Sequence, residues 1–422
     1  MKSVSRTLTG QRIAFAVIAG LFVIWGLALW LYNALFFMFA NSFAFEPVQV
    51  AWALSLYSIA YCLLAIPAAL IHRRFGYKLG LLFGFNVFVF GAFLLYLAII
   101  QNSIACFLGA IVMMGSCGTL FDTSLNPLAV EAGSPQTSVA RLNLAHVFNG
   151  FGLLVAYFAV IWLTERNYHL SPGAEAHSSL RPYVLIGLAA ILLAYLFEQV
   201  SLPGFAANPT ERASDIRGEL RSLFRDRNFL IAATSLCAYT IVLTILWTSN
   251  YNYRVHELPG HSVGLIERGP IWFVIGRCVG TAFMRWIDPT RLLQWTTGLC
   301  LIAIAITAAA GGMVGWVCLL SASLFLSIMF PTVFGSAICR HRTRMKLAAG
   351  VLVAAAGFGN ALSALFVALA LHALHIDARI VILLALPFLA IILIYSLVQH
   401  SGHKRARNTE QHAVTQANEI LI

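Results

Sequence analysis

One polar stretch in an otherwise apolar chain holds the residue types that could carry chemistry. It runs from Gly115 to Gly152 and reads GSCGTLFDTSLNPLAVEAGSPQTSVARLNLAHVFNGFG. Asp122 lies well inside an apolar run, and Asn126 follows it four residues later, on the same face of a helix. Burial in lipid disfavours a charged carboxylate, so Asp122 suits a group that takes and releases a proton. A structural aspartate that pairs with Arg277 or caps a broken helix is the alternative.

The second part of this stretch places three polar side chains along one helix face. Asn143, His146 and Asn149 follow one another at steps of three residues, which spans an arc of about 120° on a helix. Amide and imidazole groups donate hydrogen bonds to hydroxyl groups and accept them in return. We therefore expect a binding site for a hydroxyl-rich molecule here. A single buried histidine with a purely structural role is the alternative for His146.

The composition requires a membrane around these polar groups. The chain has 422 residues, of which 60% are hydrophobic and 10% are charged, and its mean hydropathy is +0.83. Soluble proteins carry about 25% charged residues, so this chain cannot hide its apolar surface from water. A bilayer core needs about 20 apolar residues for each helix. Twelve spans are expected near residues 14–39, 50–71, 79–100, 104–129, 142–163, 181–201, 228–250, 269–287, 291–311, 313–338, 347–372 and 378–398.

The distribution of Lys and Arg predicts the orientation of these spans. With the N-terminus in the cytoplasm, 21 of the 27 basic residues fall in cytoplasmic segments and five in outer loops. Cytoplasmic loops of membrane proteins carry such an excess, so we expect both termini to be cytoplasmic. This asymmetry explains the net charge of +11 without a nucleic-acid partner.

A long hydrophilic segment divides the predicted spans into two sets of six. We expect an N-terminal six-helix half over 1–205, a cytoplasmic linker over 206–227, a C-terminal half over 228–400 and a cytoplasmic tail over 401–422. Residues 214–227 of the linker could form an amphipathic helix on the inner membrane surface. Two pseudo-symmetric halves with a substrate site between them are typical of secondary transporters.

Other polar and aromatic side chains in the spans are further candidates for the site. Asp122 alone among the 16 acidic residues lies deep within a span. Aromatic rings stack on the C–H faces of sugars, but they also anchor helices at the membrane interface. The additional candidate ligands are Asn33 in the first span, Trp247, Asn250 and Tyr251 in the seventh, and Asn360 in the eleventh.

Three stretches carry a resemblance to a known family. They are PAALIHRRFGYKLG (67–80), LFDTSLNPLAVEAGSPQTSVARLNLAHVFNGFG (120–152), and HELPGHSVGLIERGPIWFVIGRCVGTAFMRWIDPTRLL (256–293) together with SIMFPTVFGSAI (327–338). These stretches resemble the fucose:proton symporter family of the major facilitator superfamily, although the first lacks the Asp of the superfamily's loop motif. The resemblance implies twelve helices, alternating access and a sugar cavity between the halves.

The resemblance also implies roles for individual residues. The family's acid in helix four falls on Asp122 and its Asn in helix five on Asn149, whereas a family Gln is replaced by His146. The fucose symporter branch has an acid in helix one where this chain has Asn33, and the family's Tyr before Pro-Thr in helix ten is Phe330. Our hypothesis is that Asp122 and His146 form a rebuilt proton-coupling pair. In the alternative, His146 only binds sugar and transport is uncoupled or coupled differently.

The sequence thus predicts an all-α integral membrane protein with the major facilitator fold. Its expected function is secondary active transport of a monosaccharide, coupled to protons, across a bacterial inner membrane. An exporter of amphipathic small molecules, an uncoupled sugar facilitator and a sensor are the alternatives. We expect no enzymatic activity, because neither a nucleotide loop nor a nucleophile with a positioned base is evident. No cofactor or metal is expected, and the family suggests a monomer in the lipid bilayer.

Overall fold

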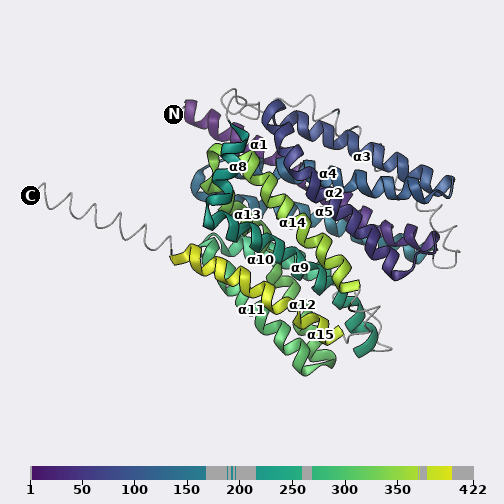
Figure 1. Cartoon of the computed structure of the whole chain (residues 1–422). Helices are drawn as coiled ribbons and strands as arrows, with labels where there is room; N and C mark the ends of the chain where they lie inside the picture. Colours follow the sequence, from purple (N-terminus) through teal and green to yellow (C-terminus); the bar gives the residue numbers. More distant parts are fainter. Residues whose placement is uncertain are drawn as a thin grey trace, which may run out of the picture.

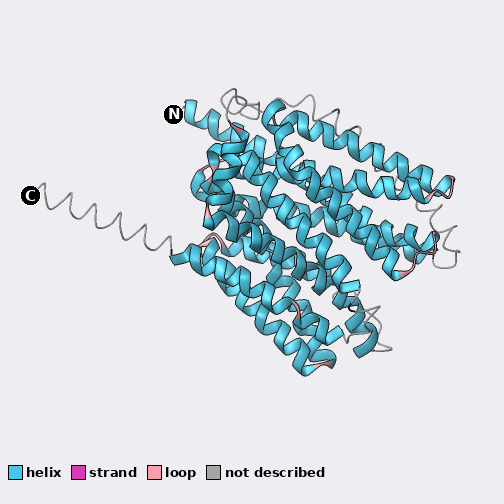
Figure 2. Ribbon diagram, viewed as in Figure 1, coloured by secondary structure: helices cyan, strands magenta, loops and turns pink. Residues whose placement is uncertain are grey.

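The computed structural model describes residues 2–167, 215–258, 269–368 and 378–401, with a few isolated positions elsewhere. Within these residues the chain is helical, with short turns and no β-strand (Figure 2). Ten of the described helices are long and apolar enough to cross a membrane, and a shorter apolar helix covers Gly269–Phe283. The prediction of an all-α membrane protein is therefore confirmed. Apart from Leu188, Leu192 and Tyr195, the predicted span 181–201 lies outside the described residues, as does almost all of the predicted tail.

The helices form one bundle in which the first and second sets lie side by side (Figure 1). The first set is α1 (Lys2–Ser42), α2 (Pro47–Phe75), α3 (Tyr77–Ile100), α4 (Ile104–Glu131), the 3-10 turn η1 (Pro135–Thr137) and α5 (Ser138–Asn167). The second set is α9 (Arg227–Glu257), α10 (Gly269–Phe283), α11 (Pro289–Ala310), α12 (Gly312–Leu326), α13 (Met329–Arg340), η3 (Arg342–Arg344), α14 (Met345–Ala368), α15 (Ala378–Leu383) and a helix over 385–401. Between them lies α8 (Ile216–Arg225).

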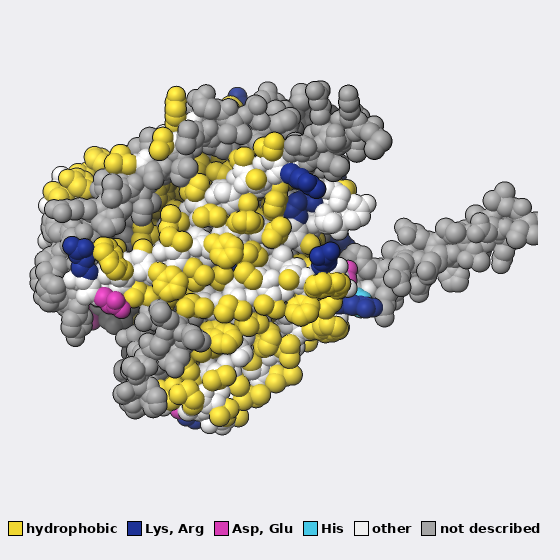
Figure 3. Space-filling model, turned by 180° about the vertical axis from the view of Figure 1, so that it is seen from behind, with side chains coloured by type: hydrophobic (Ala, Val, Ile, Leu, Met, Phe, Trp, Pro, Cys, Tyr) yellow, Lys and Arg dark blue, Asp and Glu magenta, His cyan; other side chains and the backbone are white. Residues whose placement is uncertain are grey.

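The outer surface of the bundle is apolar, as lipid contact requires. On α3, Phe83, Phe90 and Phe93 are each about half exposed. Hydrophobic side chains form a broad belt across the face in Figure 3, and most of the visible Lys and Arg side chains gather at one end of that belt. An apolar exterior of this extent has lipid as its solvent, and the gathered basic side chains agree with a cytoplasmic end.

Two helices from opposite sets form the main seam of the bundle. Along their length α2 and α14 lie side by side, while α1 packs on α5 and α3 on α4 within the first set (Figure 1). The Ser55 hydroxyl donates to the Ala361 carbonyl across this seam at 3.3 Å. Beside this seam α5 packs on α10 and α13, and α4 packs on α14, so both helices also contact the second set.

The predicted span 313–338 corresponds to the candidate membrane span Gly312–Arg340, within which the helix is interrupted. Here α12 ends at Leu326 and α13 begins at Met329, with a turn over 327–328. Pro331 has no backbone N–H, so the Ser327 carbonyl four residues earlier has no helical donor. This break exposes a backbone acceptor inside the bundle, next to the site described below.

The amphipathic helix expected in the linker is present as α8. Asp215 caps its N-terminus by accepting from the backbone N–H groups of Arg217 and Gly218, each at 3.0 Å. Glu219 forms an ion pair with Arg73 of α2 at 2.8 Å. Ser222 accepts from Arg344, close to the start of α14, at 2.5 Å. The helix thereby contacts both sets of helices at one end of the bundle.

Candidate functional site

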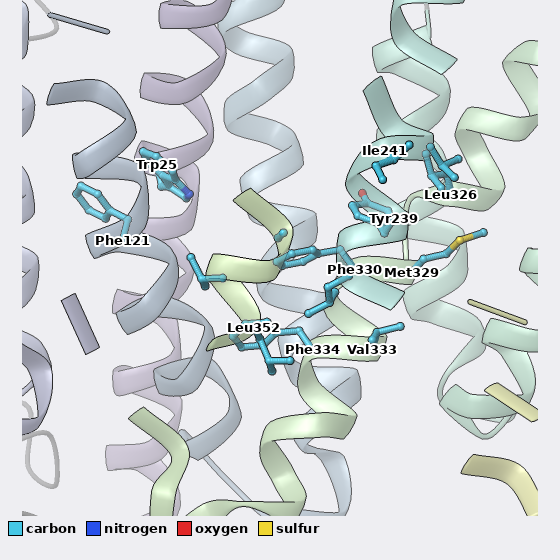
Figure 4. Packing of buried hydrophobic residues seen from close by; sticks show 14 of the residues in the cluster. Trp25, Phe121, Tyr239, Ile241, Leu326, Met329, Phe330, Val333, Phe334 and Leu352 are labelled. Atoms are coloured by element: carbon cyan, nitrogen blue, oxygen red, sulfur yellow. The ribbon is translucent and has the colours of Figure 1, made fainter. Parts of the chain in front are cut away.

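The Asp122 carboxylate receives hydrogen bonds from two other helices. Trp25 Nε1 on α1 donates to Oδ1 at 3.2 Å, and the Tyr61 hydroxyl on α2 donates to Oδ2 at 2.6 Å. The Trp25 ring stacks on Phe121, with ring centroids 5.1 Å apart (Figure 4). The side chain is only partly buried, and α4 continues through Pro127 beneath it. Asp122 is thus held in a fixed place by two hydrogen bonds and is only partly buried.

Asn126 links Asp122 to His146. Its amide nitrogen donates to the Asp122 backbone carbonyl at 3.0 Å, so its amide oxygen faces the imidazole. His146 Nε2 lies 2.9 Å from that oxygen and is therefore the protonated nitrogen of the ring. The other nitrogen, Nδ1, is buried without a hydrogen-bond partner. The two members of the predicted pair are thus neighbours through Asn126 and not in direct contact.

Asn149, one turn further along α5, is engaged by the protein itself. Its amide nitrogen donates to the Phe22 carbonyl at 3.4 Å, and its amide oxygen accepts from Arg277 Nη1 at 3.0 Å. Arg277 lies on α10, so this contact joins the two sets of helices. Its side chain is buried, with its guanidinium over the Phe273 ring at 4.5 Å. Asn149 therefore lies at a contact between the two sets of helices.

Two other predicted ligands also connect helices of opposite sets. The Asn143 amide donates to the Thr332 hydroxyl of α13 at 3.2 Å, and both residues are buried. Asn360 of α14 accepts from Thr244 of α9 at 2.9 Å and donates to Ser58 of α2 at 2.7 Å. In this structure the Asn143 and Asn360 amides therefore connect helices of the two sets.

The candidates on α9 have side-chain groups without partners. Trp247 packs on Trp30 of α1, with ring centroids 4.5 Å apart, and its indole N–H is buried without a hydrogen-bond partner. The Asn250 amide oxygen has none either. The side chains of Asn33 and Tyr251 lie outside the described residues.

The second set of helices presents mainly aromatic groups to this polar cluster. Phe330 lies 5.7 Å from the His146 ring and 5.7 Å from the Tyr239 ring. Figure 4 shows Phe330 beside Phe334 and Tyr239, separate from Trp25 and Phe121. On the side of the second set these rings lie beside the polar side chains of Arg277, Thr332 and Asn360, and on the side of the first set the rings of Trp25 and Phe121 lie beside Asp122.

Sequence reasoning missed Tyr61 and Thr332 and left the role of Arg277 open. Tyr61 carries a signal that could have been used, because Tyr57 precedes it by four residues on the same helix face. The role of Thr332 depends on how close α5 and α13 come, which no local pattern records. Among the described residues, no three His, Cys, Asp or Glu side chains are grouped as metal ligands.

Fold and site together define a polytopic membrane protein with a polar centre between two sets of helices, the architecture of a secondary transporter. The chain belongs to the Major Facilitator Superfamily, whose sequence profile matches residues 18–344. The predicted relation to fucose:proton symporters is confirmed by the relatives that follow.

Two groups of curated relatives stand out. An L-fucose-proton symporter of Escherichia coli is 28% identical over 352 residues, which cover 77% of this chain and 80% of that protein. A glucose/galactose transporter of Brucella abortus is 27% identical over 341 residues, covering 79% and 81% of the two chains. The crystal structure of FucP, the E. coli fucose:proton symporter, superposes with a TM-score of 0.81 at 24% identity, covering 92% of this chain and 99% of that one. This match supports the major facilitator fold.

Proposed function

We propose that this protein is a monosaccharide:proton symporter of a bacterial inner membrane. It would act as a monomer in the bilayer with both termini in the cytoplasm. We further propose that 1–205 and 228–400 are the two moving halves, with 206–227 as the cytoplasmic linker and 401–422 as a cytoplasmic tail. The relatives named for fucose, glucose and galactose support a sugar as the substrate.

The observation that carries the proposal is the setting of Asp122. A carboxyl group inside a membrane protein is costly, and such groups mark ion or proton pathways. Asp122 is held by the Trp25 indole and the Tyr61 hydroxyl, and it is joined through Asn126 to a histidine with a free ring nitrogen. Arg277 interacts electrostatically with Asp122 but not at salt-bridge distance, since none of the described ion pairs includes Asp122.

Within this mechanism each group has a distinct task. Asp122 would hold the proton, with His146 as its partner in coupling. The free Nδ1 of His146 would accept a hydrogen bond from a substrate hydroxyl. Asn126, Asn149 and Asn143 would bind further hydroxyls on one side of the sugar. Trp247 would stack on its apolar face from the other side, with Asn33, Asn250, Tyr251 and Asn360 as additional ligands. Proton and sugar together would then permit the halves to rock about this centre.

Uptake into proteoliposomes tests the proposal. The purified protein should take up at least one of radiolabelled L-fucose, D-glucose and D-galactose, and an imposed membrane potential should drive accumulation. For one proton per sugar, 100 mV is worth about 2.3 kcal/mol, or roughly a fiftyfold concentration ratio. Saturable uptake without accumulation would favour the uncoupled facilitator, and sugar binding without uptake would favour the sensor. The absence of both would sink the proposal.

The matched variant is Asp122→Asn, which keeps the size of the side chain but cannot carry a proton. We expect accumulation to fall to simple equilibration, while sugar exchange across the membrane continues. Asp215→Asn is the control, because Asn also caps a helix and Asp215 lies at the exposed start of α8. If Asp122→Asn still accumulated sugar against its gradient, Asp122 would not be the coupling group.

A further inference from the structure

Arg277 is a buried cation that the transport mechanism above does not use. Its side chain is 7% exposed, although it lies within a span in the middle of the chain's apolar core. Its Nη1 donates to the His146 carbonyl at 3.1 Å and to the Asn149 amide oxygen at 3.0 Å, and its Nε donates to the Ser327 carbonyl at 3.3 Å. All three acceptors are neutral. The Tyr239 side chain also hydrogen-bonds the guanidinium, and the Asp122 carboxylate interacts with it electrostatically. None of the described ion pairs includes Arg277, and a buried charge outside an ion pair is costly, so its place at this contact calls for a role.

The three acceptors come from both halves of the protein. His146 and Asn149 belong to α5 in the first set, whereas Ser327 lies at the break between α12 and α13 in the second. The Ser327 carbonyl is available because Pro331 cannot donate to it. The Arg277 guanidinium is thus anchored on its own half and reaches across to α5. Its contact with α5 exists only while the two halves are together at this level.

The contact with Asn149 occupies a group that a sugar would need. An amide oxygen that accepts from a guanidinium has one of its two acceptor positions filled by a charge-assisted bond. The Asn149 nitrogen is also directed at the protein, toward the Phe22 carbonyl. At Gly150, α5 approaches α10 so closely that an added Cβ would lie 3.1 Å from Val274. A sugar hydroxyl can therefore reach Asn149 from this side only by displacing Arg277.

We propose that Arg277 takes the place of the sugar on Asn149 while the carrier is empty, and that this contact permits the empty carrier to change sides. The inference rests on the proposed sugar transport and adds a residue that acts in the sugar-free half of the cycle. When sugar is bound, its hydroxyl replaces the guanidinium as the hydrogen-bond donor to Asn149, and the sugar then joins the two sets of helices. When sugar is absent, Arg277 donates to Asn149 instead. The two sets of helices can then come together at this level without leaving the Asn149 amide oxygen unpaired.

This role has a kinetic consequence that separates it from sugar binding and from general stability. Net uptake requires the empty carrier to return, whereas exchange of internal for external sugar does not. Removing Arg277 should slow net uptake and leave exchange nearly intact. A hydrogen bond from a charged group is worth about 1.5–3 kcal/mol, which corresponds to a rate effect of roughly tenfold or more. The sugar concentration that half-saturates exchange should be equal or lower, because Asn149 loses its competitor.

The experiment compares Arg277→Gln and Arg277→Lys with the unaltered protein in proteoliposomes. Initial net uptake and exchange are measured with whichever of radiolabelled L-fucose, D-glucose or D-galactose the unaltered protein transports. Arg285→Gln is the matched control, since Arg285 is exposed in the turn after α10 and its guanidinium lies over the ring of the neighbouring Trp286. We expect net uptake by the Arg277 variants to fall about tenfold or more, exchange to stay within about twofold, and Arg285→Gln to match the unaltered protein in both.

Each other outcome overturns the inference. Equal loss of net uptake and exchange in both Arg277 variants would make the residue a ligand or a structural element. Unchanged net uptake would show that the empty carrier does not use it. Sugar exchange by a variant shows that the variant is folded. If Arg277→Gln cannot be purified, net uptake and exchange by Arg277→Lys test the inference instead. Failure of the proposed function is distinct, because the unaltered protein would then show neither uptake nor exchange.

Discussion

At the scale of single residues, His146 is the unexpected member of the site. The family resemblance places a glutamine there, and the structure gives the histidine a defined chemical state. Its Nε2 donates to Asn126, which leaves Nδ1 buried without a hydrogen-bond partner, and the imidazole ring contacts the rings of Phe22 and Phe330. An unsatisfied buried polar atom is costly unless a ligand or a proton satisfies it during function. Both possibilities fit the site, and one substitution separates them.

His146→Gln keeps a donor for Asn126 but removes the group that can titrate. If His146 takes part in coupling, this variant should lose proton-driven accumulation while exchange of sugar continues with little change. The measurement is the steady-state accumulation ratio under an imposed proton gradient, with exchange measured in the same vesicles. His146→Leu is the comparison, and it should weaken sugar binding about tenfold because it also leaves Asn126 unpaired. Full accumulation by the glutamine variant would reduce His146 to a sugar ligand.

The site residues that could be predicted from the sequence are those whose polar or charged side chains are energetically costly to place in lipid. Asp122 stood out because it is the one acid deep within a predicted span, and Asn149 because it follows the family pattern. The partners of these residues could not be predicted in the same way. Tyr61 reaches Asp122 from α2, and Arg277 reaches Asn149 from 128 positions further along the chain. Such pairs depend on how helices from distant parts of the sequence pack.

At the scale of helices, the seam between α2 and α14 holds the carboxylate indirectly. Gly357 of α14 faces Tyr61, and an added Cβ would lie 2.7 Å from the Tyr61 ring and 3.0 Å from the Cys62 backbone. A contact below 3 Å requires the neighbouring atoms to move. Because Tyr61 donates to Asp122, any movement of the Tyr61 ring changes the surroundings of the carboxylate that we propose binds the proton.

Gly357→Ala should therefore weaken proton coupling without touching the site directly. We expect the accumulation ratio to fall severalfold, and the unfolding temperature to fall as well, since overpacking costs about 1–3 kcal/mol. Gly298→Ala on α11 is the control, because an added Cβ there meets no atom within 4 Å. The decisive comparison is the accumulation ratio of the two alanine variants under the same proton gradient. Equal ratios would show that the seam does not act on Asp122.

The helices themselves could be predicted well from hydropathy, and their boundaries less well. The split at Gly311 and Gly312 was expected, and the structure has α11 end at Ala310 and α12 begin at Gly312. The interruption at 327–328 was not expected, although Pro331 offered a signal. A proline within a span often leaves the helix continuous, as Pro127 does in α4. At Ser327, in contrast, the Arg277 guanidinium donates to the carbonyl in place of the missing backbone N–H.

At the scale of the whole molecule, the two halves contact each other toward both ends of the bundle. Toward the end that carries α8, Asn143 binds Thr332 and Arg342 binds Ser138 at 3.2 Å. Toward the opposite end, Trp30 packs on Trp247. A protein that works by alternating access must break these two groups of contacts in turn. Their relative strengths therefore set which side opens more readily.

Weakening one group of contacts should open the corresponding end. Trp30→Ala removes an aromatic pair worth about 0.5–1.5 kcal/mol beyond its buried area, so the end away from α8 should open more often. Thr332→Val keeps the shape of the side chain but removes a hydrogen bond worth about 0.5–1.5 kcal/mol, so the end that carries α8 should open instead. Each change should shift the ratio of the two open forms by about two- to tenfold, in opposite directions.

Distances between spin labels at the two ends measure this shift. One pair of labels replaces the exposed residues Val48 and Val314, at the starts of α2 and α12, and reports on the end away from α8. The other replaces Phe75 and Trp286, at and beyond the ends of α2 and α10, and reports on the α8 end. Trp30→Ala should lengthen the first distance and Thr332→Val the second, because each removes contacts from one end only. A lengthening of the same distance by both variants would mean that the halves separate as rigid bodies without alternating, and transport would then need a different conformational cycle.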